Sequence, residues 1–130
     1  MAIIISHTAI INKQGRILVL QRSFKDKVLP GFWDLPGGTA RINEKPITAA
    51  IREAKEECGL KIKDLKILAC VSNWDKAKQE NFITLIFITK KYSEHIKLNP
   101  RDHVEYAWLT KQQLKRIKTV KYFKIILNLI

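Results

Sequence analysis

The sequence predicts an α/β fold in which a mixed β-sheet lies between helices. Three features lead to this prediction: several short β-rich apolar runs, a single long amphipathic helix between them, and two helical stretches near the C-terminus. The chain has 130 residues and 46% hydrophobic content, which are typical of one globular domain and argue against disorder. We therefore expect a single domain over residues 1–130.

The first part of the chain reads as two strands followed by a loop and a turn. The runs Ala2–Ile11 and Arg16–Arg22 flank the turn-like tetrapeptide NKQG, so a β-hairpin is expected here. A loop follows over Ser23–Asp34. The next three residues, Pro36, Gly37 and Gly38, are expected to form a tight turn in which glycine supplies a positive φ.

The amphipathic helix is expected to begin near Pro46 and to end with Gly59 as its C-cap. Its apolar residues share one arc of the helix, which we expect to be buried: Ile47, Ala50, Ile51, Ala54 and Cys58. Its glutamates occupy a separate arc of about 100°.

The second part of the chain reads as three strands and two helices. Buried strands are expected over Leu65–Asn73 and Phe82–Lys90, with a polar loop over Trp74–Asn81 between them, and a further strand over His103–Leu109. Thr110 can cap a helix over Lys111–Ile117, and a last helix is expected over Val120–Leu129.

The cysteines and the chain ends favour a cytoplasmic protein. Cys58 and Cys70 lie in apolar surroundings without a metal-ligand spacing, so both are expected to be reduced core residues. The apolar stretches at the two ends are too short to cross a membrane, and the N-terminal one lacks a basic leader and a cleavage site. No membrane association is expected, and the protein is expected to be a monomer or a homodimer.

The net charge of +12, from 24 basic and 12 acidic residues, favours anionic partners. The lysines are scattered along the chain, without an arginine-rich block or an aromatic RNA-binding pattern, so nucleic acid is not an expected partner. The charge is equally compatible with a polyphosphate substrate and does not decide between the two.

The most informative feature of this basic chain is a cluster of acids on the amphipathic helix. Glu53, Glu56 and Glu57 are spaced so that they share a helix face, where like charges repel unless a cation lies among them. Hard oxygen ligands of this kind suit Mg²⁺ or Mn²⁺. The alternative is a solvated acidic helix face.

The segment from Gly38 to Leu60 resembles the Nudix box, Gly-x5-Glu-x7-Arg-Glu-U-x-Glu-Glu-x-Gly-U, in which U is a bulky aliphatic residue. Ala54 is the one departure, since it is smaller than the usual residue at the first U. The stretches FWDLPGG before the box and EYAWLT near the C-terminus also resemble the family. The matching positions are Gly38, Glu44, Arg52, Glu53, Glu56, Glu57, Gly59 and Leu60.

The resemblance implies a Nudix-type α/β/α sandwich and a set of site residues. Glu53, Glu56 and Glu57 would hold the metal together with the backbone carbonyl of Gly37, and either Glu53 or Glu56 would orient or deprotonate the attacking water. Arg52 belongs to the same catalytic set and would fix the glutamates by ion pairing. Glu44 would pair with Arg52 or reach the metal through water, and Gly38 and Gly59 would be structural.

Further candidates lie outside the box. Asp102 and Glu105 can supply an additional acid or base or be ordinary surface residues, and His7 and His103 can act as bases or be polar residues near the surface. Arg22, at the end of a strand, can grip a phosphate or be a simple surface charge. Trp74 can stack on a nucleobase or pack against a neighbouring strand.

The resulting expectation is a Mg²⁺- or Mn²⁺-dependent Nudix hydrolase that cleaves a nucleoside diphosphate linked to another group. The length resembles MutT-type nucleoside triphosphate pyrophosphohydrolases, so the expected partner is a nucleotide or another small molecule that contains a diphosphate. The alternative is a catalytically inactive Nudix-fold module that binds a nucleotide or nucleic acid. Such modules typically lose one or more box glutamates, and all of them are present here.

Overall fold

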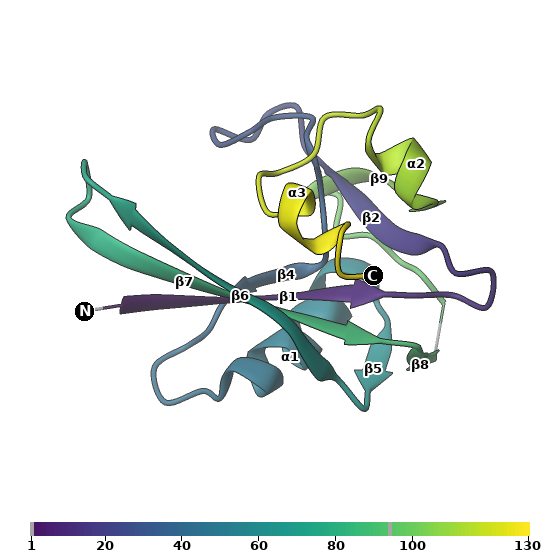
Figure 1. Ribbon diagram of the computed structural model, residues 1–130, viewed down its shortest axis with the longest axis horizontal. Helices are drawn as coiled ribbons and strands as arrows, with labels where there is room; N and C mark the ends of the chain where they lie inside the picture. The colour runs from purple at the N-terminus through teal and green to yellow at the C-terminus, as the bar shows by residue number, and fades with distance from the viewer. Residues whose placement is uncertain (1, 94) are drawn as a thin grey trace.

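The computed structural model describes residues 2–93 and 95–130. Within these ranges the chain forms three sheets (Figure 1). The largest has the order β4-β1-β7-β6. Its strands are β1 (Ala2–Ile10), β4 (Gly37–Thr39), β6 (Lys66–Asp75) and β7 (Glu80–Thr89). Because β1 and β7 are parallel while the other pairs are antiparallel, the predicted mixed sheet is confirmed.

The two smaller sheets are antiparallel. One has the order β3-β2-β9, with β2 (Ile17–Arg22), β3 (Trp33–Asp34) and β9 (His103–Leu109). The other pairs β5 (Lys61–Lys63) with β8 (Lys91–Ser93).

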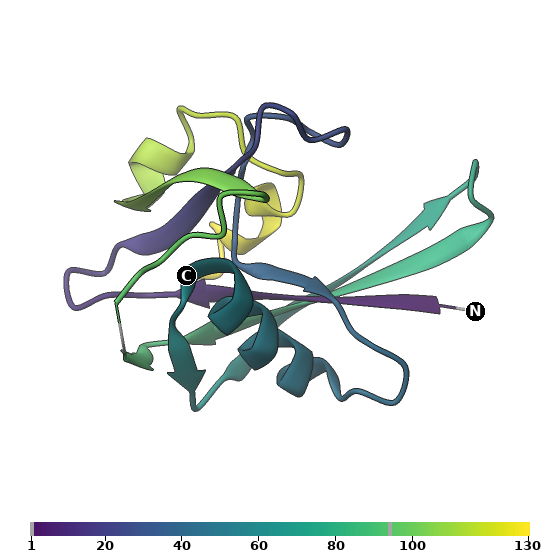
Figure 2. The ribbon, with the colours of Figure 1, turned by 180° about the vertical axis from the view of Figure 1, so that it is seen from behind.

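Helices cover the largest sheet from both sides, which confirms the α/β/α fold class (Figures 1 and 2). The long helix α1 (Pro46–Cys58) lies on one side, and the short helices α2 (Lys111–Leu114) and α3 (Phe123–Ile126) lie on the other. Two apolar cores result. The core on the α1 side contains Ile10, Leu18, Leu20, Ala54, Cys58 and Leu60, and the other contains Ala9, Val19, Ile86, Leu114, Phe123 and Ile126.

The prediction of a β-hairpin between the first two strands is wrong, because β1 and β2 belong to different sheets. Both edges of β1 are already paired, one with β4 and the other with β7, so β2 turns away into a different sheet. Beyond the turn, an isolated bridge between Ile11 and Ile17 joins the ends of the two strands, and no more extended pairing between them is found among the described residues. The predicted turn itself is present, with the Gly15 N–H donating to the Asn12 carbonyl oxygen at 2.9 Å.

The polar loop expected over Trp74–Asn81 is also wrong, because the two strands extend into it and form a long hairpin that projects from the body of the molecule (Figures 1 and 2). Trp74 is paired with Asn81 and is 56% exposed. Since β6 is an edge strand, it is largely exposed along its length and not buried as predicted. Cys70 is exposed on this strand, whereas Cys58 is buried as expected; both are free thiols.

The helix α1 begins and ends as predicted. Pro46 occupies its first turn, and Gly59 caps its C-terminus with a φ of 77° and an N–H that donates to the Lys55 carbonyl oxygen. Its buried face consists of small side chains: Ala49, Ala50, Ala54 and Cys58. Ile47 and Ile51, which were expected to be buried, are each 38% exposed. A face of small residues lets the helix approach the sheet closely.

The two C-terminal helices are shorter than predicted. Thr110 caps α2 in a capping box with Gln113, but the helix ends at Leu114. Beyond it the backbone pairs with β3: the Trp33 N–H donates to the Lys118 carbonyl oxygen and the Val120 N–H donates to that of Trp33. This pairing requires extended backbone and therefore separates α2 from α3.

No helix among residues 2–93 and 95–130 has both the length and the apolar composition needed to cross a bilayer.

Gly37 and Gly38 do not form the expected turn with positive φ, since both belong to the short strand β4. Glycine is needed at Gly37 for a different reason, which is space. A Cβ at this position would lie 2.3 Å from the Ser6 carbonyl oxygen and 2.4 Å from Nδ1 of His7. The strand can therefore lie this close to β1 only without a side chain.

We predict that Gly37→Ala lowers the free energy of unfolding by about 2 kcal/mol or more, because backbone atoms of β1 must move to admit the methyl group. Gly15→Ala is the matched control. Gly15 has a φ of +77° with open space around it, so alanine there carries only the backbone strain of about 1 kcal/mol. Urea denaturation of both variants measures the difference, and equal destabilisation would contradict the packing argument.

Candidate functional site

The site is built around the carboxyl group of Glu57, near the C-terminal end of α1. The Gly37 N–H donates a hydrogen bond to its Oε1 at 2.7 Å, which joins the helix to β4. The side chain is only 14% exposed. A carboxyl group held by a backbone N–H at a mostly buried position is fixed in place before any ligand binds.

The electrostatic surroundings of Glu57 are strongly acidic. Burial raises the pKa of Glu57 to about 8, and the hydrogen bond from Gly37 only partly offsets this rise. The neighbouring charges of Glu53, Asp34 and Asp102 raise it further. Charges of the same sign are thus concentrated around one buried group within a chain that is otherwise basic.

Arg52 connects three of the four box glutamates, Glu44, Glu53 and Glu56. Its guanidinium holds both carboxylate oxygens of Glu44, with Nε to Oε2 at 2.8 Å and Nη2 to Oε1 at 2.9 Å. Nη1 donates to Glu53 at 2.7 Å and to Glu56 at 3.1 Å. The hydrogen bonds from Arg52 lower the pKa of Glu44 to about 2, and Glu44 in turn raises that of Arg52. The pairing of Glu44 with Arg52 is therefore present in the structure.

Glu53 and Glu56 differ in their exposure. Glu53 is 16% exposed and packs over Gly38, where a Cβ would lie 2.7 Å from its carboxylate, so Gly38 has a steric role. The side chain of Glu56 is 49% exposed and also lies 3.7 Å from a guanidinium nitrogen of Arg41. Glu53 thus belongs to the interior of the cluster and Glu56 to its rim.

Within the part of the chain that the structure describes, no three His, Cys, Asp or Glu side chains are arranged to hold a metal ion. The Glu53 and Glu56 carboxylates are engaged by Arg52, and that of Glu57 by Gly37. The donor chemistry nevertheless fits a hard divalent cation, because these are carboxylate oxygens and the buried Glu57 has an excess of negative neighbours.

Arg22 is engaged within the protein. Its guanidinium donates to Asp26 at 2.9 Å, to Asp34 at 3.3 Å and to the Val28 carbonyl oxygen at 3.0 Å. These contacts tie the loop after β2 to β3. A role of Arg22 in gripping phosphate stays a prediction, and it would require some of these hydrogen bonds to be exchanged for a ligand.

A buried polar network that could not be predicted from the sequence lies beside the glycines. Asp34 accepts a hydrogen bond from the Tyr122 hydroxyl, and Nδ1 of His7 lies 2.9 Å from the Leu35 carbonyl oxygen. The rings of His7 and Tyr122 are 5.2 Å apart. His7 therefore has internal partners in Leu35, directly after β3, and in Tyr122 of the C-terminal segment. Asp34 and Tyr122 are far apart in sequence, and no local motif links them.

The other predicted candidates lie in different places. Asp102 is an exposed loop residue close enough to Glu57 to influence it electrostatically, and its carbonyl oxygen accepts the Ser23 N–H. Glu105 lies on β9, where its carboxylate accepts the N–H of Tyr106. Trp74 lies near the tip of the projecting hairpin. Of these three residues, only Asp102 has an interaction with the acidic cluster.

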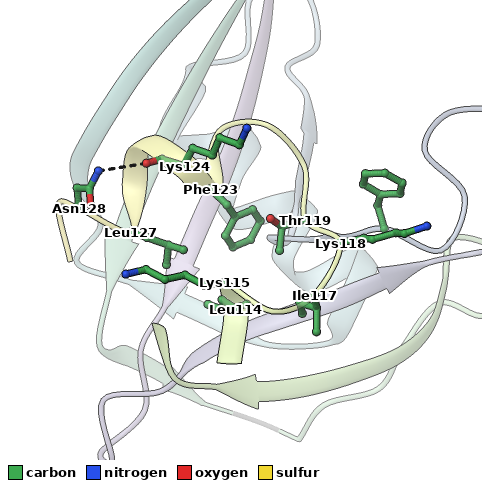
Figure 3. A pocket seen from close by; sticks show the side chains of 10 residues that line it. Leu114, Lys115, Ile117, Lys118, Thr119, Phe123, Lys124, Leu127 and Asn128 are labelled. Atoms are coloured by element: carbon green, nitrogen blue, oxygen red, sulfur yellow. Dashed lines mark hydrogen bonds between the residues drawn. The ribbon is translucent and has the colours of Figure 1, made fainter. Parts of the chain in front are cut away.

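Two hollows in the protein surface differ in their position relative to the box glutamates. One, of about 470 Å³, lies beside Glu56 and is lined by Lys55, Lys97 and His95. Another, of about 400 Å³, lies at the C-terminal segment (Figure 3). This second hollow is lined by Leu114 and Phe123, which belong to the apolar core on the side of the sheet away from α1. The side chains of Lys115 and Lys124 also line it. Only the first hollow adjoins the glutamates.

Comparison with known proteins gives partial matches to characterised relatives. The chain is 37% identical over 65 residues to an RNA pyrophosphohydrolase from Hydrogenovibrio crunogenus, a match that covers 50% of this chain and 36% of that protein. It is 34% identical over 64 residues to an 8-oxo-dGTP diphosphatase from Proteus vulgaris, covering 49% of this chain and 56% of the relative. The aligned part is thus between about a third and just over half of the length of these relatives.

Among solved structures, the fold resembles a MutT NUDIX hydrolase from Burkholderia pseudomallei. The TM-score is 0.88 at 25% identity, with 100% of this chain and 98% of that chain covered. The model of the NUDIX domain family matches residues 4–128, which is nearly the whole chain. With the box residues assembled as described above, the chain belongs to the NUDIX domain family.

Proposed function

We propose that this protein is a Mg²⁺- or Mn²⁺-dependent pyrophosphohydrolase of MutT type, formed by one domain over residues 1–130. Its substrate would be a nucleoside triphosphate, cleaved to the monophosphate and pyrophosphate. The observation that carries the proposal is the mostly buried Glu57 carboxyl group, held by the Gly37 N–H beside Glu53 within an acidic cluster. A cluster of this kind, in a chain of net charge +12, is suited to a cation bound to a polyphosphate.

The cation would be held by Glu53, Glu56 and Glu57, with the Gly37 carbonyl oxygen as a further ligand. When bound, it supplies charge neutralisation on the phosphate oxygens and lowers the pKa of water. Arg52 orients Glu53 and Glu56 and balances part of their charge. Glu53 or Glu56 accepts the proton of the attacking water.

The substrate class is supported by chemistry and by the family. Lys55 and Lys97 line the hollow next to Glu56, and their ammonium groups favour a phosphate chain there. The relatives named above are an RNA pyrophosphohydrolase and an 8-oxo-dGTP diphosphatase, and both names denote cleavage of a phosphate anhydride. The shared chemistry is a diphosphate attached to a nucleoside.

A panel assay tests the proposal. Purified protein is incubated with Mg²⁺ or Mn²⁺ and a set of nucleoside triphosphates, oxidised nucleotides, ADP-ribose and 5′-triphosphorylated RNA, and the released phosphate or pyrophosphate is measured. Metal-dependent release from at least one triphosphate is expected. No release from any member of the panel, with either metal, would contradict the proposed activity.

We predict that Glu53→Gln and Glu56→Gln each lower kcat by at least about 100-fold, because each removes a charge needed in the transition state while keeping the shape of the side chain. Folding should survive, since repulsion between like charges is relieved. Glu80→Gln, on the hairpin strand β7, is the matched control and should keep full activity. Full turnover by the Glu53 or Glu56 variant would mean that the chemistry lies elsewhere.

A second prediction concerns how the free energy of unfolding of the metal-free protein depends on pH. The pKa of Glu57 is raised from 4.5 to about 8 by folding, so the native state holds this proton more tightly than the unfolded state does. Its contribution to stability is therefore full below about pH 4.5 and is lost as the pH rises through about 8. Relative to Glu57→Gln, the free energy of unfolding of the wild type should fall across this range in urea titrations with a chelator. Parallel pH profiles for the two proteins would contradict the raised pKa.

A third prediction concerns the phosphorus atom that is attacked. In the MutT-type reaction, water oxygen bonds to the β-phosphorus, the bond from the β-phosphorus to the bridging oxygen breaks, and the nucleoside monophosphate leaves with that oxygen. Hydrolysis in ¹⁸O-labelled water should therefore place the label in pyrophosphate, as measured by mass spectrometry. Label in the monophosphate would show attack at the α-phosphorus and would leave the metal-site proposal intact.

A further inference from the structure

His103 has an environment that its position on a strand does not explain. It is the first residue of β9 and is only 4% exposed. Its Nδ1 has no hydrogen-bond partner among the described residues. A buried polar atom without a partner destabilises the protein, so a second arrangement in which this atom forms a hydrogen bond would be favourable.

The carboxylate that Nδ1 of His103 faces is that of Glu57. Nδ1 lies 4.0 Å from Oε2, which is too far for a hydrogen bond. The other oxygen of this carboxyl group, Oε1, already accepts the N–H of Gly37 at 2.7 Å. Gly37 thus contacts one oxygen of Glu57, while His103 lies near the other oxygen at a distance about 1 Å longer than a typical N–H···O hydrogen bond.

Backbone hydrogen bonds hold the two residues in register. The Asn99 N–H donates to the Glu57 carbonyl oxygen at 3.1 Å, and the His103 N–H donates to the Asn99 carbonyl oxygen at 3.1 Å. The loop before β9 is therefore fastened to the end of α1. The backbone thus keeps the side chains of His103 and Glu57 close to each other.

We propose that His103 is a positioning residue for Glu57, and that its Nδ1–H donates a hydrogen bond to Oε2 of Glu57 when this carboxylate binds a divalent cation. The inference rests on the proposed function, because it assigns His103 to the same site. Gly37 and His103 then hold the two oxygens of Glu57 from β4 and β9. Partners that orient a metal ligand typically change metal affinity or activity by about 10- to 100-fold when they are removed.

Three substitutions separate the hydrogen bond from packing. His103→Leu fills a similar volume without a donor. His103→Asn places an amide nitrogen near the position of Nδ1, whereas the longer His103→Gln places it near that of Nε2. We expect Mn²⁺ dissociation constants, measured by electron paramagnetic resonance of free Mn²⁺, to rise about tenfold or more for the Leu and Gln variants. The Asn variant should remain within about threefold of the wild type.

Tyr106→Leu is the matched control, because Tyr106 lies on the same strand β9 and is 41% exposed, and this variant should bind Mn²⁺ as the wild type does. A double-mutant cycle between His103→Leu and Glu57→Gln gives a second readout. If His103 acts through Glu57, the two losses of Mn²⁺ affinity should be clearly less than additive in free energy. Thermal melting without metal verifies that each variant is folded.

The outcomes separate the two proposals. Wild-type affinity in the Leu and Gln variants would overturn the positioning role and leave the proposed function standing. Equal impairment of the Asn, Leu and Gln variants, or fully additive losses in the cycle, would assign His103 to packing and overturn the inference as well. Absence of Mn²⁺ binding by the wild type would overturn both proposals.

Discussion

The arrangement of the site depends on the hydrogen bond from the Gly37 N–H to Glu57. It joins α1 to β4 at the point where β4 approaches β1 so closely that no side chain fits at Gly37. The bond therefore fixes α1 on β4, and through β4 it also fixes the position of α1 relative to β1. Because the acceptor is a mostly buried carboxyl group among other acids, the same contact that fixes the site also concentrates charge in it. The position of Glu57 and the raised pKa of its carboxyl group thus have the same structural origin.

Arg52 compensates for part of this charge. With its five hydrogen bonds to Glu44, Glu53, Glu56 and the Thr39 carbonyl oxygen, it uses the full donor capacity of a guanidinium group. It contacts every box glutamate except Glu57. Glu57, whose pKa burial raises to about 8, is thus the one that Arg52 does not contact, and under the proposed function this is where an external cation would be most favourable.

The sequence predicted what depends on short-range spacing. The bounds of α1, its cap at Gly59 and the shared face of the glutamates follow from residues within one helix. The partner of each strand does not, since β1 pairs with a strand some eighty residues away and this pairing excludes the expected hairpin. The internal partners of Arg22 and the position of His103 next to Glu57 likewise depend on long-range pairing. For this reason the sequence alone did not predict the internal contacts of either residue.

The charge distribution gives the site a further property. The chain carries +12 overall, so its field at long range attracts a polyphosphate, while the acids around Glu57 repel the same anion at short range. Under the proposed function, a ligand that brings or meets a divalent cation would satisfy both conditions. The basic surface would therefore increase the encounter rate with anions of many kinds. The acidic cluster, in contrast, would restrict productive binding to those whose phosphates share a metal ion with Glu53, Glu56 and Glu57.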